Sequence, residues 1–350
     1  MKNKKMFFLF ELNHPKHYYQ FKYIMSDLER RGHEIVVLAR NKDILLNVLE
    51  EEGVLYKIFG KHKKSLWGKI FNTFSILTSY RKILRQCKPD MIVSKASFYG
   101  TFLAKLSRIP AVIFPDSEIV WVTNKFVAPL ATKIVTPLTF ERSYGEKHIR
   151  IKGFFENCYL DPCIFTPLSS YEGSRNLKKP YTVLRFIGWT ANHDIRNSGF
   201  SPEEKRELVQ ELSKYTSVYI SSEVKLPQEL EKYKLNVPSK WIHQVLSGAD
   251  LYIGDSQTMA TEAALLGTPA IRSNSFVGVN DMSNFKILEN KFHILFNIKE
   301  FFGVKAKAVE ILTDQNSKEE WCKKRDCYFQ TTGNSNEEIV QILLNVAGKS

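Results

Sequence analysis

The sequence predicts an α/β protein made of two Rossmann-like, doubly wound domains that face an interdomain cleft. Three observations support this fold class. The chain has 350 residues, more than one hydrophobic core usually serves, so two domains of roughly 150 residues are expected. Short apolar runs alternate with helical patterns in both halves, which is typical of parallel sheets covered on both faces. A stretch that lacks periodicity and is rich in Pro, Ser and Gly separates the halves.

These observations also place the domain boundaries. We expect the first domain over residues 1–158, a linker over 159–180 and the second domain over 181–334, with a last helix over 335–350 that packs back on the first domain. In the first half, apolar runs predict strands over 4–12, 33–39, 54–60, 90–95, 111–116 and 133–137, and helical spacing predicts helices over 20–32, 42–53, 65–86 and 99–108. In the second half, the same signals predict strands over 181–188, 217–223, 250–254 and 269–273, with helices over 202–215, 241–249 and 259–267.

The segment 252–274 reads as strand, turn, helix and strand. Asp255 and Ser256 are favoured N-cap residue types, whereas Gly267 and Pro269 mark the end of the helix. A helix start offers free N–H groups and a positive dipole end, so an anion such as phosphate suits this position. An ordinary βαβ connection produces the same pattern.

The net charge of +13 is concentrated in one segment. Residues 53–89 contain no Asp or Glu and nine basic residues: Lys57, Lys61, Lys63, Lys64, Lys69, Arg81, Lys82, Arg85 and Lys88. Apolar residues including Trp67 and Phe71 recur there at helical spacing. This pattern predicts contact with an anionic membrane or acceptor surface through Lys63, Lys64, Trp67, Lys69, Phe71, Arg81 and Lys82. Alternatively, the apolar stripe faces the sheet and only the cations act.

Several classes of protein are disfavoured. No window approaches a membrane span, and no nucleic-acid-binding motif accompanies the charge. The five cysteines are sparse and odd in number, so we expect reduced thiols and no metal site. The sequence also lacks an Asp-x-Asp metal motif and a G-x-G-x-x-G fingerprint. We expect a cytoplasmic protein, peripheral on the inner face of the cell membrane if the basic segment binds lipid, with no nucleic acid partner and no obligatory cofactor.

Ligands of open α/β sheets bind beyond the carboxyl ends of the strands, so residues that directly follow strands are candidates. In the first half these are Asn13, His14, Lys16, His17, Asp116, Ser117 and Glu118. In the second half they are Trp189, Asn192, His193, Asp194, Arg196, Ser221, Ser222, Glu223 and residues 255–258.

The stretches "NHPKHYYQFKYIMSDLERRGHEIVVLAR", "PDSE", "GFFENCYLDP", "LRFIGWTANHD" and "GDSQTMATEAALLGTPAIRSNSFVG" carry a resemblance. The chain resembles an uncharacterised prokaryotic family with a GT-B-like fold, related to UDP-N-acetylglucosamine 2-epimerases and GT-B glycosyltransferases. The last stretch is similar to the nucleotide-sugar-binding helix of these epimerases and of the lipid-linked N-acetylglucosamine transferases of peptidoglycan synthesis. The resemblance spans Asn13 to about Phe296.

The resemblance implies roles for residues of the second half. It implies that Glu262 contacts ribose hydroxyls and that Ser256, Gln257 and Thr258 approach the diphosphate, beside Asp255 and Ser221. The epimerases carry two glycines where Gln257 and Thr258 stand, which changes the room for a phosphate. Arg185, His193 and Arg196 are expected to balance the charge of a departing diphosphate. Alternatively, Arg185 pairs with a carboxylate, and Glu262 is a solvated helix residue.

The catalytic residues are expected in the first half. Asp116 and Glu118 follow a strongly apolar strand, and we expect partial burial to raise a carboxylate pKa toward the range of a general base. His14 and His17 are further candidates. The alternatives are an N-capping role for the two carboxylates and a structural role for the histidines.

The leading functional hypothesis is a GT-B glycosyltransferase. It would transfer a sugar from a nucleotide-diphosphate sugar, UDP-linked in the first instance, to a cell-envelope glycan or lipid-linked acceptor. A nucleotide-sugar 2-epimerase or hydrolase, and a non-catalytic nucleotide-sugar-binding protein, are the alternatives.

Overall fold

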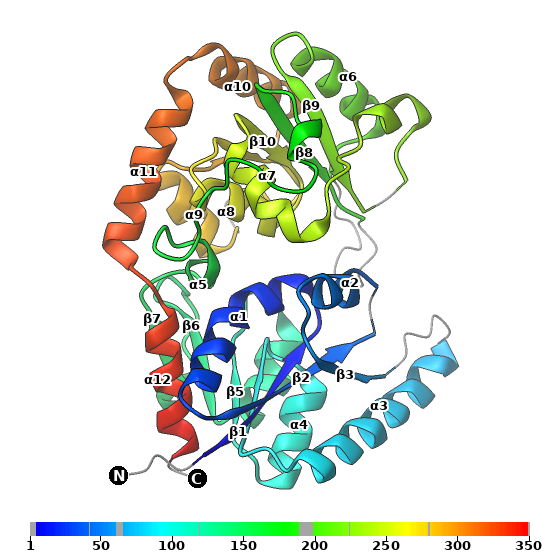
Figure 1. Cartoon of the computed structure of the whole chain (residues 1–350), viewed down its shortest axis with the longest axis vertical. Coiled ribbons are helices and arrows are strands. Elements are labelled where there is room, and N and C mark those ends of the chain that lie inside the picture. Colours follow the sequence, from blue (N-terminus) through cyan, green and yellow to red (C-terminus); the bar gives the residue numbers. More distant parts are fainter. Residues whose placement is uncertain are drawn as a thin grey trace. The chain divides into compact units, whose positions relative to one another are not determined.

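A computed structural model describes residues 5–41, 43–60, 66–118, 120–188, 199–223, 225–278 and 281–348, without side chains for 43 and 66–72. The chain divides into two compact units. Unit 1 comprises Met1–Tyr159 and Gly333–Ser350, and unit 2 comprises Leu160–Thr332. Each unit is built around its own parallel sheet (Figure 1). No helix among the described residues is long and apolar enough to cross a membrane.

Unit 1 contains a sheet of seven strands in the order β3-β2-β1-β4-β5-β6-β7. The strands are β1 (Phe7–Leu12), β2 (Glu34–Arg40), β3 (Tyr56–Phe59), β4 (Met91–Ser94), β5 (Ala111–Ile113), β6 (Lys133–Pro137) and β7 (His148–Ile151). All neighbouring pairs are parallel. The strand order reverses between β1 and β4, so this sheet has its topological switch point there. In such sheets, ligands bind beyond the carboxyl ends of the strands at the switch point.

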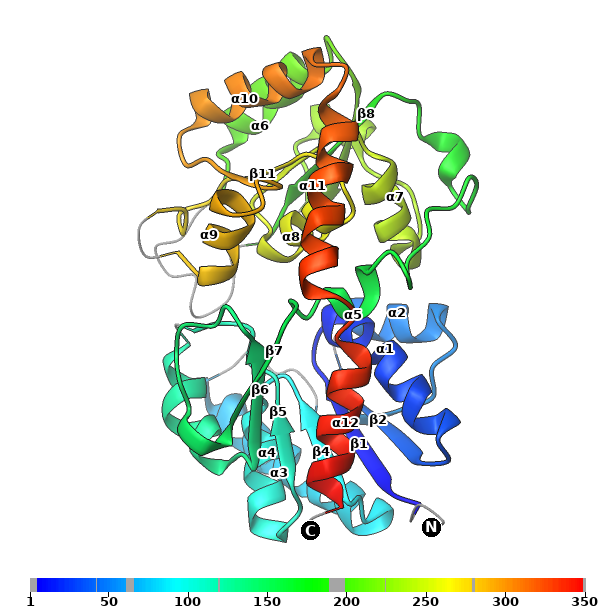
Figure 2. The ribbon, with the colours of Figure 1, turned by 90° about the vertical axis from the view of Figure 1, so that its left-hand side faces the viewer.

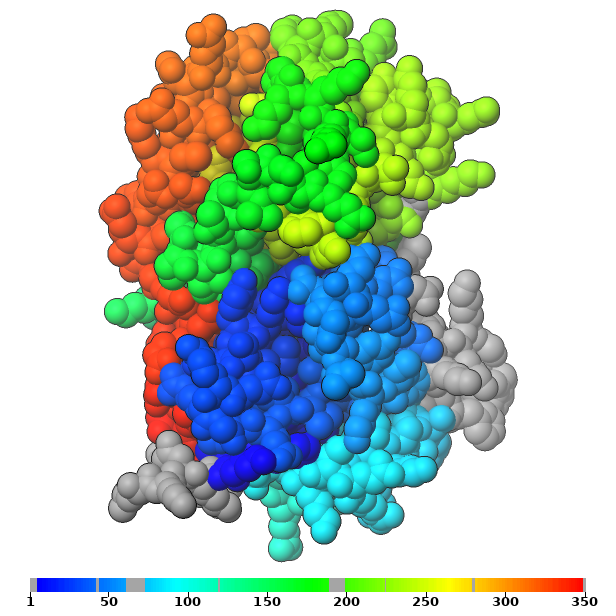
Figure 3. Space-filling view, viewed as in Figure 1, coloured from blue at the N-terminus to red at the C-terminus, as the bar shows by residue number. Residues whose placement is uncertain are grey.

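Helices cover both faces of this sheet. They are α1 (Pro15–Arg30), α2 (Asp43–Glu51), α3 (Leu66–Cys87), α4 (Phe98–Ser107), α5 (Asn157–Leu160) and α12 (Asn336–Ala347), with shorter helical turns at Thr123–Val127, Ala128–Leu130 and Gly145–Lys147. α12 comes from the far end of the chain and packs along α1 (Figure 2). Arg31 and Glu337 join the two helices through an ion pair of 2.5 Å. In the space-filling view, α1 and α2 (blue) form one face of unit 1, with α12 (red) at its edge (Figure 3).

Unit 2 contains a sheet of five strands in the order β12-β11-β10-β8-β9. The strands are β8 (Tyr181–Phe186), β9 (Ser217–Ser222), β10 (Leu251–Gly254), β11 (Ala270–Arg272) and β12 (Phe296–Asn297). The helices are α6 (Pro202–Leu212), α7 (Ile242–Gly248), α8 (Gln257–Leu265), α9 (Ser283–Asn290), α10 (Phe301–Thr313) and α11 (Ser317–Thr332), with turns at Ser174–Asn176, Gln228–Tyr233 and Ser239–Trp241. All pairs are again parallel, and the order reverses between β8 and β10.

The helix α8 (Gln257–Leu265) begins and ends within two residues of the range 259–267 that the sequence predicts, and its cap is the predicted one. Ser256 is its N-cap, and the Ser256 side chain accepts a hydrogen bond from the backbone N–H of Met259. The helix ends at Leu265, and Gly267 has a φ of +77°, a conformation that glycine adopts without strain. Met259 to Leu265 are all buried, because α8 packs against β10, β11 and α7 within unit 2.

Residues 160–180, for which the sequence predicts a linker, belong to unit 2. The side chain of Gln244 on α7 forms two hydrogen bonds with the backbone of this segment. It accepts a hydrogen bond from the backbone N–H of Leu168 at 2.8 Å and donates one to the carbonyl of Thr166 at 3.0 Å.

Candidate functional site

The switch point of unit 1 gathers charged side chains from three elements. Lys95 directly follows β4, Asp116 follows β5 closely, and Lys16 lies in the first turn of α1. Pro15 and the N-cap residue His14 start α1 immediately after β1, which brings Lys16 to the carboxyl edge of the sheet. Glu156 completes the group. We call Lys16, Lys95, Asp116 and Glu156 the charged cluster.

Lys95 is the most buried member of the charged cluster. Its side chain is 2% exposed. The ammonium forms an ion pair with Asp116, donates a hydrogen bond to Oε1 of Gln20 at 2.6 Å, and lies 3.7 Å from the ring centroid of Phe155. Burial lowers the pKa of Lys95 to about 8, although the charge of Asp116 opposes this shift. Lys95 is absent from the residues that the sequence predicts, although it occupies a position directly after a strand.

Asp116 faces two lysines, and this corrects the sequence-based expectation for its pKa. Burial alone raises a carboxyl pKa, but the charges of Lys16 and Lys95 outweigh it and lower the pKa of Asp116 to about 2. Nζ of Lys16 lies 3.9 Å from Asp116 and 2.8 Å from Glu156. The Asp116 side chain is 37% exposed, so it is the member of the cluster that solvent reaches.

The two histidines after β1 have roles in the turn. Nδ1 of His14 accepts the backbone N–H of Lys16 at 3.2 Å, and Nδ1 of His17 accepts the backbone N–H of Asn13 at 3.1 Å. Burial, with the charge of Lys95, lowers the pKa of His17 well below its ordinary value. The neutral ring of His17 therefore carries its proton on Nε2, where it is a donor. In this arrangement His17 does not act as a base at Nε2.

Glu11, at the end of β1, is a second carboxylate that the sequence analysis does not single out. It is fully buried in an otherwise apolar strand. The Asn13 amide and the Tyr80 hydroxyl each donate a hydrogen bond to it at 3.1 Å. Burial raises the pKa of Glu11 above its ordinary value. A Cβ at Gly100 would lie 2.2 Å from Oε2 of Glu11, so any larger residue there would displace the Glu11 carboxylate.

Glu118 is held in the loop after β5. Its Oε1 accepts the backbone N–H of Glu141 at 2.7 Å, and its backbone carbonyl accepts the side-chain amide of Asn124 at 2.9 Å. These contacts tie two loops together. They give Glu118 a structural task and distinguish it from Asp116.

The switch point of unit 2 brings Asp255 and Arg185 together. Oδ1 of Asp255 accepts the backbone N–H of Ile187 at 2.9 Å, and the N–H of Asp255 donates to the carbonyl of Arg185 at 3.2 Å. Asp255 thus joins the ends of β8 and β10. A Cβ at Gly254 would lie 2.8 Å from the Arg185 carbonyl oxygen, so the close approach of β10 to β8 requires a glycine at this position.

Arg185 is neutralised by a carboxylate, as one of the two sequence-based alternatives predicts. Its guanidinium forms an ion pair with Glu223 and donates a hydrogen bond to Ser221 at 2.8 Å. The side chain is 16% exposed. Its charge is therefore balanced within unit 2, and Ser221 is part of the same contact.

Glu262 is buried on α8, which excludes the solvated-residue alternative. The residue is 4% exposed, and Oε1 lies 3.2 Å from Nε2 of His243 on α7. Glu262 follows the N-cap Ser256 by six positions, so it lies within the second turn of the helix. Gln257 and Thr258 are half-buried in the first turn. The sequence does not single out His243, because its contact with Glu262 depends on the packing of α7 against α8.

Some of the predicted residues lie outside the described ones. These are Lys61, Lys63, Lys64, Trp189, Asn192, His193, Asp194 and Arg196. Trp67, Lys69 and Phe71 lie on α3, but their side chains are not described. Further along α3, Ile76, Tyr80 and Leu84 are buried against the sheet, whereas Arg81 and Lys82 are exposed. Phe74 on the same helix is 66% exposed, so the described residues of α3 bury only part of the predicted apolar stripe and leave Arg81 and Lys82 free to act.

Arg272, at the end of β11, is a buried cation in unit 2. It is 0% exposed, forms an ion pair with Asp281, donates to Oδ1 of Asn297 at 2.8 Å and stacks 3.6 Å from the ring centroid of Phe285. Burial lowers the pKa of Arg272 against the opposing charge of Asp281. This cluster orders the turn after β11.

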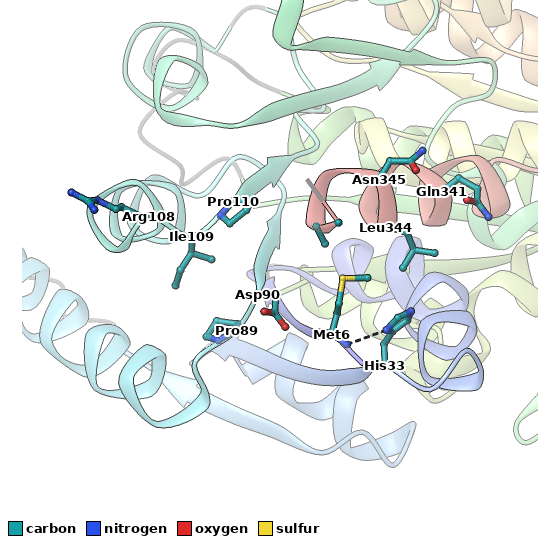
Figure 4. A pocket seen from close by; sticks show the side chains of 12 residues that line it. Met6, His33, Pro89, Asp90, Arg108, Ile109, Pro110, Gln341, Leu344 and Asn345 are labelled. Carbon is teal, nitrogen blue, oxygen red and sulfur yellow. Dashed lines mark hydrogen bonds between the residues drawn. The ribbon is translucent and has the colours of Figure 1, made fainter. Parts of the chain in front are cut away.

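Unit 1 also contains a cavity of about 590 Å³ at the opposite edge of its sheet, where β1, β4 and β5 begin. Met6, His33, Asp90 and Leu344 are among its lining residues (Figure 4). Nδ1 of His33 accepts the backbone N–H of Met6 at 3.2 Å. This cavity is distinct from the charged cluster. Within the described part of the chain, no three His, Cys, Asp or Glu side chains gather as metal ligands would.

Comparison with known proteins relates the chain to two groups. Residues 8–157 match the family described as "Protein of unknown function (DUF354)". An uncharacterized protein of Methanocaldococcus jannaschii is 23% identical over 283 residues, which cover 75% of this chain and 80% of that protein. A UDP-N-acetylglucosamine–N-acetylmuramyl-(pentapeptide) pyrophosphoryl-undecaprenol N-acetylglucosamine transferase of Clostridium botulinum is 24% identical over 243 residues. That match covers 64% of each chain, less than two thirds of the transferase.

Solved structures show the same fold over nearly the whole chain. The UDP-GlcNAc 2-epimerase from Neisseria meningitidis, bound to UDP-GlcNAc, has a TM-score of 0.72 at 14% identity, and the match covers 97% of this chain and 100% of that one. The spinosyn forosaminyltransferase SpnP has a TM-score of 0.67 at 14% identity, with coverage of 99% and 100%. The chain therefore has the fold of GT-B glycosyltransferases and UDP-GlcNAc 2-epimerases, and its residues 8–157 match the DUF354 family.

Proposed function

We propose that the protein is a GT-B glycosyltransferase. It transfers a sugar from a nucleotide-diphosphate sugar, UDP-linked, to a cell-envelope glycan or lipid-linked acceptor. The observation that carries this proposal is the buried Glu262–His243 pair on a helix whose capped N-terminus follows β10 at the switch point of unit 2.

The geometry of α8 supports a nucleotide site. The N-terminus of this helix lies at the carboxyl edge of a parallel sheet, where its N–H groups and dipole favour a diphosphate. One or two turns further on, Glu262 is buried and oriented by His243 at 3.2 Å. A carboxylate accepts several hydrogen bonds, so a Glu262 that is held in this way suits the two hydroxyls of a ribose.

The charged cluster of unit 1 supports a role in the transfer step. In this proposal Asp116 contacts the acceptor, because it is the most exposed carboxylate of the charged cluster, at the switch point of unit 1. Glu118, which is tied to the Glu141 backbone, holds the loop. His14 and His17 shape the turn into α1.

A lipid-linked acceptor is supported by a surface of unit 1 on α4 and the neighbouring 120–127 segment. Exposed apolar side chains gather there: Phe98, Phe102, Leu106, Val120, Trp121, Val122 and Phe126. We call these residues the aromatic surface. Trp121 is 60% exposed, and Lys125 lies 5.0 Å from its ring centroid. α4 packs beside α3 (Figure 2), which carries the exposed Arg81 and Lys82. Exposed aromatic side chains beside cations suit an anionic bilayer.

Calorimetric titration with UDP, GDP, dTDP, CMP and AMP tests the donor class. We expect micromolar binding of UDP. Glu262→Ala should weaken it by roughly 1.5–3 kcal/mol, the range of a hydrogen bond to a charged group. Glu262→Gln keeps the shape of the side chain and should weaken binding less. Urea denaturation of each variant checks that the protein remains folded.

Two further outcomes decide between the candidate activities. If a nucleotide sugar is converted without any acceptor, the protein is an epimerase or hydrolase. If a folded wild-type protein binds none of the five nucleotides, the transferase proposal is wrong. If UDP binds and Glu262→Ala binds it equally well, Glu262 does not hold the ribose.

A further inference from the structure

Lys95 is a buried cation at the switch point, where the proposed function needs a group that exchanges a proton. Its ammonium contacts Asp116, Gln20 and the Phe155 ring. A lysine that only supports the fold gains little from this position, because burying an ammonium costs free energy even when it is paired.

The groups around Lys95 define its electrostatics. The titratable and charged side chains that act on it or respond to its charge are Asp116, Lys16, Glu156, His17 and Cys158. Burial keeps His17 neutral by lowering its pKa and keeps Cys158 a thiol by raising its pKa. The charges that remain are those of two lysines and two carboxylates. The cluster is therefore neutral as a whole, and the loss of one proton would leave it negative.

Asp116 with its two lysine neighbours is a poor base by itself. At a pKa of about 2 it holds a proton only weakly. Lys95, with a pKa of about 8, is the member of the cluster that loses its proton near neutral pH. When Lys95 is neutral, Asp116 loses one of its two counter-charges, and its affinity for a proton rises. Two groups coupled so closely titrate as a pair.

A buried donor at the same place lacks a hydrogen-bond partner in the described part of the chain. Gln20 is 0% exposed, and its Oε1 accepts the hydrogen bond of Lys95. Its Nε2 has no hydrogen-bond partner among the described residues. An unsatisfied buried donor is costly, and an oxygen of a bound ligand beside the Lys95–Asp116 pair would satisfy it.

We propose that Lys95 and Asp116 act together as the base of the transfer, with Asp116 accepting the hydrogen bond of the acceptor hydroxyl and Lys95 holding the proton afterwards. This inference rests on the proposed function. Lys95 acts through Asp116 and is a positioning residue, whereas Asp116 touches the substrate.

The acceptor oxygen forms a bond to the anomeric carbon, and the bond from that carbon to the diphosphate oxygen breaks, with its electron pair leaving on the diphosphate. The hydroxyl proton passes to the Asp116–Lys95 pair, where it converts the neutral amine of Lys95 into an ammonium. Loss of this proton to solvent restores the pair.

The first test is the dependence on pH of kcat/KM for the nucleotide sugar, measured with saturating acceptor. The neutral fraction of Lys95 rises up to about pH 8, so the wild-type rate should rise about tenfold per pH unit below that value and then level off. Lys95→Arg keeps the positive charge but cannot lose its proton. It should abolish the rise and reduce the rate at pH 8.

Lys318 provides a matched control. It is another buried lysine whose pKa burial lowers to about 8, but it donates to the carbonyls of Ser247 and Ala249 in unit 2. Lys318→Arg should leave the pH profile unchanged. If Lys95→Arg also keeps the wild-type rise, the inference is wrong while the transferase proposal stands. If the wild type transfers no sugar at any pH, the proposed function fails, and the inference fails with it.

A second measurement does not require turnover. NMR of protein labelled with 13C at the lysine Cε reports the titration of each lysine, and Lys95→Met identifies the signal of Lys95. We expect a midpoint near pH 8. Asp116→Asn should lower it further, because the opposing charge is lost. A midpoint at the ordinary value, or one that Asp116→Asn leaves unchanged, would overturn the inference.

Discussion

Arg272 shows what a buried charge contributes at the scale of a residue. Its ion pair with Asp281, its hydrogen bond to Asn297 and its stacking on Phe285 hold three segments of unit 2 around one fully buried guanidinium. Removing one partner leaves the other charge buried and unpaired, which costs more than the pair contributes.

Arg272→Met should therefore lower the free energy of unfolding by about 3–5 kcal/mol. Urea denaturation measures this change. The double variant with Asp281→Asn should recover part of the loss, because no unpaired carboxylate remains. Arg206→Ala is the exposed control, since Arg206 pairs with Glu203 and Glu229 on the surface, and its effect should be much smaller. Equal effects of Arg272→Met and Arg206→Ala would contradict this account.

The sequence indicates some site residues and misses others for a physical reason. Asp116 and Asp255 follow apolar strands, and Arg185 is the second-last residue of β8. A position at or just after the end of a parallel strand predicts a place at the sheet edge. The same rule applies to Lys95 after β4. The partners of Lys95 and Glu262, which are Gln20 and His243, lie within helices, where the sequence pattern does not distinguish a polar contact from an ordinary buried position. The pKa of Asp116 depends on the charges of Lys16 and Lys95, so the direction of its shift could not be predicted without tertiary contacts.

At the scale of an element, the serine N-caps of α8 and α6 allow the stability of a helix to be distinguished from its role in binding. Ser256 accepts the N–H of Met259 at the start of α8. Ser201 accepts the N–H of Glu204 at the start of α6, with Glu204 bonding back to the Ser201 N–H. Both caps satisfy helix N–H groups, but only α8 follows β10 at the switch point of unit 2.

Ser256→Ala and Ser201→Ala should each lower the free energy of unfolding by about 1 kcal/mol, the usual effect of losing an N-cap. Only Ser256→Ala should weaken UDP binding, because the α8 N-terminus is the proposed site of the diphosphate. Denaturation and calorimetry on the same preparations measure both effects. If Ser201→Ala weakens UDP binding as much as Ser256→Ala does, the effect is one of stability and not of the site.

Most elements are confirmed because their signals are local. The alternating apolar runs predict parallel strands, and the structure has two parallel sheets. Local signals also predict the start and end of α8 at Ser256 and Gly267. The environment of α3 is decided by tertiary packing instead. Its apolar stripe is compatible with both a membrane-surface helix and a core-facing helix. Ile76, Tyr80 and Leu84 are buried, as in a core-facing helix, whereas Phe74 is 66% exposed.

At the scale of the whole molecule, the distribution of positive charge bears on membrane binding. The net charge of +13 includes the basic residues of 53–89, among which Arg81 and Lys82 are exposed on α3. The aromatic surface lies on the adjacent α4 and the 120–127 segment of the same unit. Basic residues near an anionic bilayer contribute about 1 kcal/mol each, and exposed aromatic side chains add apolar contact.

Sedimentation with phosphatidylglycerol vesicles at low salt should therefore retain the wild-type protein, whereas phosphatidylcholine vesicles should not. Replacing both Arg81 and Lys82 by Ala should weaken binding by roughly thirtyfold, the equivalent of about 2 kcal/mol. Replacing Trp121 and Phe126 by Ser should weaken it at all salt concentrations, because this contribution is not screened. The control replaces Lys323 and Lys324 on α11 by Ala. It changes the net charge equally and should bind as the wild type does. If the control loses binding to the same extent, the attraction comes from net charge alone, and neither α3 nor the aromatic surface is a specific membrane contact.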